Sequence, residues 1–167
     1  MDDRAEKFYV GIGSRKTPRE ILRLIYEFAI YLARTGWTLR SGRAEGADQA
    51  FEKGAKDGYG PTEIFHPEDA TAAALELAAK YHPAWDRCNE YARKLLARDC
   101  HQVLGYDLKT PAKFIFCWTP DGSIGITTRE TGGTGQAIRV AKANNIPIYN
   151  LARPEHLIII KKKIGWL

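Results

Sequence analysis

Apolar positions along the chain follow two periods, one typical of buried strands and the other typical of helices that cover a sheet. Residues 8–12 and 114–118 form short runs rich in aromatic and β-branched side chains, as expected of buried strands. Between these runs, apolar residues recur every three or four positions, as at Ile21, Leu24 and Phe28. The alternation predicts an α/β fold with a single doubly wound, mainly parallel, Rossmann-like sheet and helices on both faces.

The same periods give approximate bounds for each element. Strands are expected over residues 8–12, 37–39, 63–65, 114–118 and 146–149, and Pro147 indicates that the last one lies at a sheet edge. Helices are expected over residues 18–35, from the 41–48 segment to about 56, and over 68–80, 84–104 and 134–144. The tail is ambiguous because Pro154 favours a helix start whereas three consecutive isoleucines favour a strand, and we expect a helix there.

Two helix starts carry capping signals, and the whole chain reads as one unit. Thr17, Pro18 and Glu20 match a capping box in which Thr17 is the N-cap and Pro18 the first helical residue. Thr134 is expected to cap a later helix, after a connection over 119–133 that is long for an ordinary loop. The chain of 167 residues has no internal repeat or linker, so residues 1–167 are expected to form one domain.

Three glycine-bearing segments, 11–14, 41–46 and 131–135, each follow an expected strand and precede an expected helix. In an open parallel sheet such segments lie together beyond the carboxyl ends of the strands, where ligands bind. Glycine lets a phosphate approach the backbone, and a helix start supplies N–H donors and a positive dipole end. The segments together predict a site for a phosphorylated ligand, although any one of them can be an ordinary turn.

Two common nucleotide-binding motifs are not matched. Lys16 stands where a dinucleotide-binding GxGxxG fingerprint would need its third glycine, and no Gly-Lys-Ser/Thr follows at the spacing of a P-loop. We therefore expect no ordinary dinucleotide cofactor, no ATP hydrolysis and no resident cofactor.

Charge and cysteine usage add further limits. The chain has 25 Lys and Arg against 20 Asp and Glu, a formal charge of +5 that suits either solubility or an anionic partner. Cys88, Cys100, Cys117 and the four histidines lack metal-ligand spacing, so we expect reduced thiols and no metal site. The charged residues 1–7 and the lack of an apolar run of ~20 residues predict a cytoplasmic protein with no membrane span.

The glycine segments resemble those of the SLOG superfamily, which includes DprA-type DNA-processing proteins, LOG-type nucleotide phosphoribohydrolases and nucleotide-signal sensor domains. The resemblance covers residues 8–151 and extends in particular to short, often phage-encoded DprA-like recombination mediators. DprA-like members typically carry Ser-Gly-Gly-Ala-x-Gly-Ala-Asp, whereas here Arg43 replaces the second Gly and adds a cation. The resemblance implies a Rossmann-like fold and a nucleotide-type ligand. The candidate ligand-binding residues are Gly11, Gly13, Ser14, Arg15, Ser41, Gly42, Arg43, Ala44, Gly46, Asp48, Gly132, Gly133, Thr134, Gly135, Gln136 and Arg139.

The resemblance also bears on catalysis. LOG-type enzymes continue the Gly-Gly-x-Gly motif with Thr-x-x-Glu, and that Glu is implicated in cleaving the base–ribose bond. Gln136 and Arg139 occupy these two positions here, and a guanidinium cannot stabilise developing positive charge. The missing acid argues against LOG-type hydrolysis unless Glu45 or Glu130 supplies a carboxylate from a neighbouring loop.

Helical phase indicates how two groups of polar residues are oriented. Gln136 and Arg139 lie three residues apart on a face that excludes Ile138, which leaves Arg139 free to face ligand or solvent. The expected helix 84–104 has a basic stripe with one aromatic residue, made of Arg87, Tyr91, Lys94 and Arg98. That stripe is either a solvated face, supported by a pair such as Glu90 with Lys94, or an anion-contacting face.

Three functions stay open from the sequence. The leading one is binding of a nucleotide or nucleotide-derived signalling ligand, which would sequester a host signal in the host cytoplasm if the chain is phage-encoded. The second is a DprA-like single-stranded DNA-binding recombination mediator, supported by the basic balance and by Lys161, Lys162 and Lys163. The third is a LOG-like nucleoside monophosphate N-glycosidase. Because related domains often dimerise, we also expect a homo-oligomer, a dimer or higher.

Overall fold

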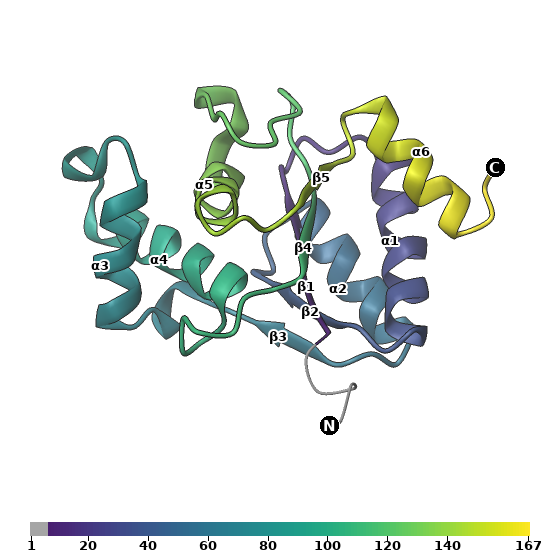
Figure 1. Cartoon of the computed structure of the whole chain (residues 1–167), viewed down its shortest axis with the longest axis horizontal. Helices are drawn as coiled ribbons and strands as arrows, with labels where there is room; N and C mark the ends of the chain where they lie inside the picture. Colours follow the sequence, from purple (N-terminus) through teal and green to yellow (C-terminus); the bar gives the residue numbers. More distant parts are fainter. Residues whose placement is uncertain (1–6) are drawn as a thin grey trace.

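The computed structural model describes residues 7–167, so most of the charged N-terminal segment, residues 1–6, lies outside the described residues (Figure 1). One sheet runs through the molecule, and all its strand pairs are parallel, in the order β3-β2-β1-β4-β5. This arrangement confirms the doubly wound α/β fold and places the last strand at an edge. The strands are β1 (Phe8–Gly13), β2 (Thr38–Ser41), β3 (Thr62–Ile64), β4 (Phe114–Trp118) and β5 (Ile148–Asn150).

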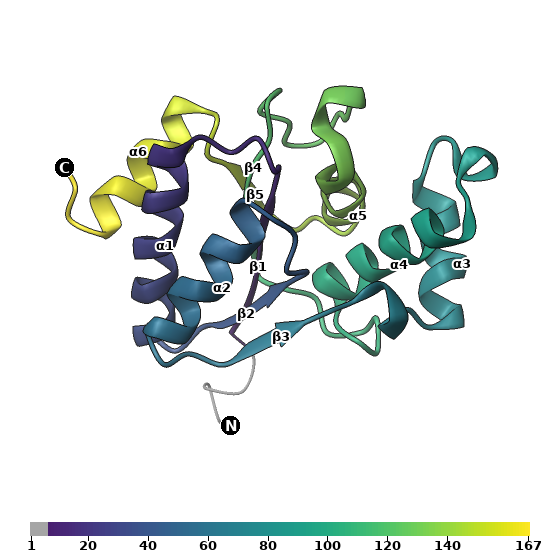
Figure 2. The same ribbon diagram turned by 180° about the vertical axis from the view of Figure 1, so that it is seen from behind.

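Helices cover both faces of the sheet, as Figures 1 and 2 show from opposite sides. Three of them, α1 (Arg19–Arg34), α2 (Ala47–Asp57) and α6 (Pro154–Lys163), pack on one face. On the other face lie α4 (Glu90–Leu104) and α5 (Gly135–Ala143), and α3 (Ala72–Tyr81) packs against α4 on the side away from the sheet (Figure 1). The helix expected in the tail is therefore confirmed as α6. Within the described residues, no helix combines the length and apolar character that a membrane crossing requires.

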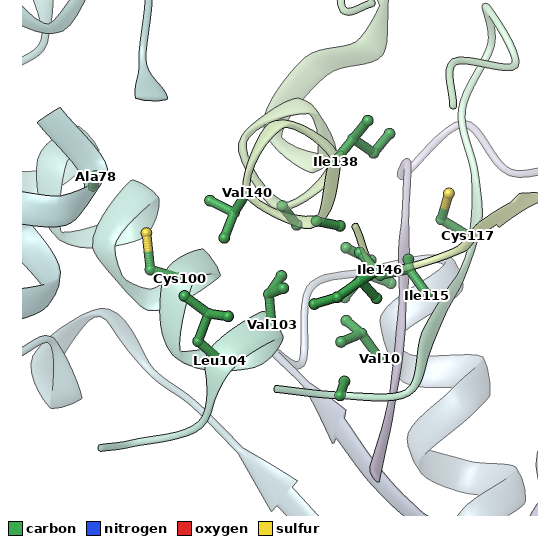
Figure 3. Close-up of a cluster of buried hydrophobic side chains, with 14 of the residues drawn as sticks. Val10, Ala78, Cys100, Val103, Leu104, Ile115, Cys117, Ile138, Val140 and Ile146 are labelled. Atoms are coloured by element: carbon green, nitrogen blue, oxygen red, sulfur yellow. The ribbon is translucent and has the colours of Figure 1, made fainter. Parts of the chain in front are cut away.

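Each face of the sheet has its own hydrophobic core. On the α1–α2–α6 side, Phe28 and Phe51 are buried against the aromatic side chains of β1 and β4. On the opposite side, Val10 and Ile115 of the neighbouring central strands meet α4 and α5 (Figure 3). Because these strands are covered on both faces, they read in the sequence as apolar runs without strict alternation.

The chain reverses its direction of travel across the sheet between β1 and β4. It first builds β1, β2 and β3 outward, and then crosses back through α3 and α4 to add β4 on the other side of β1. Ligand sites of open α/β sheets lie beyond the carboxyl ends of the strands at such a switch point. The connections that follow β1, β2 and β4 all lie at that edge.

Two expected helix starts are wrong. Pro18, not Thr17, is the N-cap of α1, and no side chain caps this helix, because the hydroxyl of Thr17 donates instead to the carbonyl of Ser14 at 2.6 Å. Helix α4 begins at Glu90 rather than near residue 84, because Asn89 caps it by accepting from the backbone N–H of Ala92 at 2.8 Å. The preceding residues form a short 3-10 turn, Trp85–Arg87.

The long connection between β4 and α5 is ordered around one carboxylate. Asp121 accepts hydrogen bonds from the hydroxyls of Thr119, Thr128 and Thr131. The connection ends in a 3-10 helix, Arg129–Thr134, that leads directly into α5. Thr134 precedes α5, but its side chain makes no capping hydrogen bond, so that expected cap is also wrong.

Candidate functional site

Asp48, at the start of α2, ties the first two glycine segments together. Its Oδ1 accepts from the backbone N–H of Gly13 at 3.0 Å, and its Oδ2 accepts from that of Ala44 at 3.4 Å. The side chain is buried at 4% exposure. The hydroxyl of Ser41 adds a second link by donating to the carbonyl of Gly11 at 2.6 Å. The β1 and β2 connections therefore form one rigid unit at the carboxyl edge of the sheet.

Two glycines in this unit are required by close backbone approach. A Cβ atom on Gly13 would lie 2.7 Å from the Cβ of Ala47 and 2.8 Å from the carbonyl oxygen of Trp118. Gly46 has a φ of +90°, and a Cβ there would lie 2.7 Å from the carbonyl oxygen of Ser14. These glycines let the β1 and β2 connections pack against each other and against the end of β4.

The third glycine segment is open. Gly132 has a φ of +69°, and a Cβ atom on either Gly132 or Gly133 would meet nothing within 4 Å. Both residues are exposed, whereas the next two, Thr134 and Gly135, are buried at the start of α5. The exposed glycines thus lie where the positive end of the α5 dipole favours an anion.

Arg43, which stands where the DprA-like motif has its second glycine, adopts a backbone conformation that favours glycine. Its φ is +60°, in the left-handed region that ordinary residues rarely adopt. Its guanidinium turns away along α2 and makes two hydrogen bonds of 2.9 Å to the carboxylate of Glu52, which also pairs with Lys56. The cation that the sequence adds beside the site is therefore paired within the protein.

Arg139 and Gln136 share a face of α5, as helical phase predicted, but that face is not open. Arg139 donates through Nε and Nη2 to the amide oxygen of Gln136 at 3.2 and 2.8 Å, and through Nη1 to the hydroxyl of Thr127 at 2.8 Å. Gln136 is fully buried, and its amide nitrogen donates to the carbonyl of Ala78 in α3. Arg139 is partly exposed, but its guanidinium is already held by Gln136 and by Thr127 of the β4–α5 connection.

Beside the three glycine segments, helix α4 forms a further side of the site, the α4 wall, through Arg98, Asp99 and Gln102. The glycine motifs did not indicate this helix. Arg98 donates to the carbonyl of Gly42 at 3.1 Å and, through Nε, to Oδ1 of Asp99 at 3.2 Å. A Cβ atom on Gly42 would lie 2.5 Å from both Arg98 Nη1 and the amide nitrogen of Gln102. Helix α4 therefore packs directly against the β2 connection.

Two buried carboxyl groups give the site unusual titration behaviour. Burial raises the pKa of Asp48 to about 6, although Arg98 and the backbone N–H donors oppose the shift. Burial likewise raises the pKa of Asp99 to about 7, where Asp48 adds to the shift while Arg98 and Arg139 oppose it. Such perturbed groups in a ligand-binding edge are typical of functional sites.

The basic stripe expected on residues 84–104 does not form one face. Arg87 lies in the 3-10 turn before α4, and Arg98 turns inward with only 13% of its side chain exposed. Lys94 makes the expected pair with Glu90, at 3.6 Å. Of the stripe, only Arg98 contacts the glycine segments.

The remaining candidate residues lie at the rim. Arg15, Glu45 and Glu130 are all exposed, and Glu130 belongs to the 3-10 helix that precedes Gly132. Within residues 7–167, no three His, Cys, Asp or Glu side chains are grouped so that they could hold a metal ion. The structure therefore combines the three glycine segments with Asp48 and α4, and the two candidate catalytic glutamates lie exposed within or next to these segments.

The chain is similar to known proteins in structure rather than in sequence, because neither a family model nor a curated protein matches it. It is similar to the molybdenum cofactor carrier protein MCP from Chlamydomonas reinhardtii, with a TM-score of 0.52 and 19% identity over 97% of this chain and 87% of that one. It is also similar to DNA processing protein A (DprA) from Streptococcus pneumoniae, with a TM-score of 0.54 and 17% identity over 87% of this chain. The match spans half of the DprA chain. These similarities confirm the Rossmann-like α/β fold that the sequence predicted.

Proposed function

We propose that this protein binds a nucleotide or nucleotide-derived ligand at the carboxyl edge of the sheet, with a phosphate group over the Gly132–Gly135 turn. The observation that carries the proposal is the contrast between the glycines at this edge. The space beside Gly13 and Gly46 is occupied by closely packed atoms, whereas Gly132 and Gly133 lie against open space before the N-terminus of α5. An exposed backbone at a helix start, beside a switch point, is the usual place for a phosphate.

Similarity in fold supports a binding role at a coarse level only. One structural relative is named as a carrier of a cofactor and the other for DNA processing. Arg139, in the position of the LOG-type glutamate, is held by Gln136 and Thr127 and offers no acid. We therefore favour binding over base–ribose cleavage.

The experiment that tests the proposal is calorimetric titration with pyrophosphate and the common ribonucleoside mono- and diphosphates, on the wild type and on Gly133→Val. The valine would cover the open backbone, and we expect it to weaken binding about tenfold or more while the free energy of unfolding changes by less than about 0.5 kcal/mol. Gly125→Val is the matched control, because Gly125 lies in the same β4–α5 connection and faces only the flexible side chain of Lys142, at 3.4 Å. The proposal is wrong if no phosphate-bearing ligand binds or if Gly133→Val binds as the wild type does.

Nucleic-acid binding is the second candidate, and a different surface favours it. A hollow of about 460 Å³ between α1 and α6 is lined by the aromatic and basic residues Tyr26, Tyr31, Arg34 and Lys163, together with Glu27, Ile30 and Ile164. Aromatic rings beside cations are the combination that holds single-stranded nucleic acid. This surface is on the opposite face of the sheet from α4 and α5 (Figure 2). An oligonucleotide titration at several salt concentrations decides between nucleotide binding and nucleic-acid binding. Steep salt dependence of oligonucleotide binding, without any mononucleotide binding, would favour nucleic-acid binding.

A further inference from the structure

Helix α4 presents two buried polar side chains to the site, Asp99 and Gln102, and each has an acceptor oxygen that no described residue uses. Asp99 is 6% exposed, and only its Oδ1 is engaged, by Arg98; its Oδ2 accepts no hydrogen bond from the described residues. Gln102, one turn later on the same helix, is 1% exposed, and its amide oxygen is buried without a partner among those residues. Buried polar groups are normally hydrogen-bonded, so this pair indicates that something else completes the wall.

Both side chains lie beside the glycine segments. The amide nitrogen of Gln102 would be 2.5 Å from a Cβ atom on Gly42, so this side chain reaches the β2 connection. Asp99 feels the charges of Asp48 on α2, of Arg98 on its own helix and of Arg139 on α5. Asp99 is therefore close enough to Asp48 on α2 and to Arg139 on α5 for the charges of both to act on its carboxyl group.

The chemistry of these groups restricts their missing partner. A carboxylate repels phosphate, and it accepts strongly from hydroxyl groups. In a nucleotide, the groups that can donate two adjacent hydrogen bonds next to a phosphate are the hydroxyls of the ribose. Other doubly wound folds hold a ribose hydroxyl through an acidic side chain in this way, although from a different position in the chain.

We propose that Asp99, with Gln102 beside it, binds the ribose hydroxyls of the ligand, so that the site selects ribonucleotides over 2′-deoxyribonucleotides. This inference rests on the proposed nucleotide-binding function and narrows it. The phosphate contacts at α5 supply affinity that any phosphorylated ligand can use, whereas Asp99 supplies selectivity for the sugar.

The titration of Asp99 gives the inference a second, independent readout. Burial raises its pKa to about 7, and Asp48, Arg98 and Arg139 are the charged groups facing it from α2, α4 and α5. Hydroxyl donors stabilise the ionised carboxylate, so the preference for ribose should be larger at pH 8 than at pH 5.5. The 2′-deoxyribonucleotide is the reference at each pH, because its phosphate titrates in the same way.

The experiment is a calorimetric comparison of AMP, GMP, CMP and UMP with their 2′-deoxy counterparts and with pyrophosphate, on the full chain. We expect the best ribonucleotide to bind about tenfold or more tightly than its deoxy form, as one hydrogen bond to a charged group allows. Asp99→Asn should reduce that ratio to about twofold or less and leave pyrophosphate affinity unchanged. Glu90→Gln, the same change at an 88% exposed side chain of α4, should leave the ratio as in the wild type.

The outcomes separate this inference from the proposed function. If neither nucleotides nor pyrophosphate bind, the proposed function fails and the inference fails with it. If ligands bind but the wild type does not distinguish ribose from deoxyribose, the inference alone is overturned, and this result needs no variant. A ratio that survives in folded Asp99→Asn, or that does not change between pH 5.5 and pH 8, overturns it as well.

Discussion

Asp48 is the residue that most directly shapes the site, because its carboxylate supplies the hydrogen-bond acceptor for a backbone N–H group in each of the first two glycine segments. It accepts from the backbone of Gly13 and of Ala44, 35 and 4 residues away in the chain. Buried backbone N–H groups without acceptors are costly, so the two connections depend on this carboxylate. A favourable position near a helix N-terminus is only part of its role.

Asp48→Asn should therefore destabilise the protein. The amide has a single acceptor oxygen, and its NH₂ group would face a backbone N–H, so one buried donor loses its partner. We expect the free energy of unfolding at pH 7 to fall by about 1–3 kcal/mol, measured by urea denaturation. Asp86→Asn, at an exposed position, should change it by less than about 0.5 kcal/mol. Equal stability of the two variants would show that Asp48 does not hold the connections together.

Some site residues could be predicted from the sequence and others could not. The meeting of the glycine segments was predictable because three of them follow strands of one parallel sheet, whose carboxyl ends lie at the same edge. The pairing of Arg43 with Glu52 was not, because it depends on a left-handed backbone conformation that the sequence does not specify. Asp99 had a usable signal: it lies four residues after Leu95 and four before Val103, so an acidic residue occurs in the apolar phase of a helix.

At the scale of elements, the two hydrophobic periods placed the five strands and every helix except the ambiguous one in the tail, and the largest errors fall at helix starts. A capping box was expected at Thr17, yet the hydroxyl of Thr17 is used by the turn that follows β1. The start of α4 was expected near residue 84 because Pro83 can begin a helix, but Asn89 offers a better cap six residues later. Capping residues compete with turns for the same hydrogen bonds, and sequence alone does not decide that competition.

The cap of α4 has a measurable consequence. Asn89→Ala removes the acceptor for the N–H of Ala92, so we expect a loss of about 1 kcal/mol in the free energy of unfolding. Asn89→Asp keeps an equally good cap and should retain the stability of the wild type. Thermal or urea unfolding of the three proteins measures both effects. A helix that began near residue 84 would instead be insensitive to alanine at position 89.

At the scale of the whole molecule, the sheet separates two faces that differ in the side chains they bury. The α1–α2–α6 face is rich in aromatic contacts and carries Asp48 on α2, whereas the opposite face carries Asp99 on α4 and the start of α5 (Figure 3 shows the core of that face). The sequence predicted a doubly wound, mainly parallel sheet but not the order of its strands, because periodicity does not say which strands are neighbours. The convergence of the loops follows from that order, which puts β1 and β4 side by side.

The buried carboxyl groups should make the stability of the molecule depend on pH in an unusual direction. Asp99 has a pKa of about 7 in the folded chain, against about 4 for an unfolded Asp, so the folded chain holds its proton over a range in which the unfolded chain has lost it. Stability from this group is therefore complete below pH 4 and declines as the pH rises to about 7. Asp48, with a pKa of about 6, acts in the same direction.

Glu52 affects the pH dependence of stability in the opposite direction from Asp99 and Asp48, and over a lower pH range. Arg43 lowers its pKa to about 2, so its contribution is present above about pH 4.5 and is lost as the pH falls towards 2. Urea unfolding from pH 2 to pH 8 resolves the two windows. Between pH 4 and pH 7 the wild type should lose more stability than Asp99→Asn, whereas Glu52→Gln should differ from the wild type in its slope only below pH 4.5. Parallel curves for the wild type and Asp99→Asn between pH 4 and pH 7 would mean that Asp99 is hydrated in the folded chain, and its carboxylate would then have no unmet acceptor to offer a ribose.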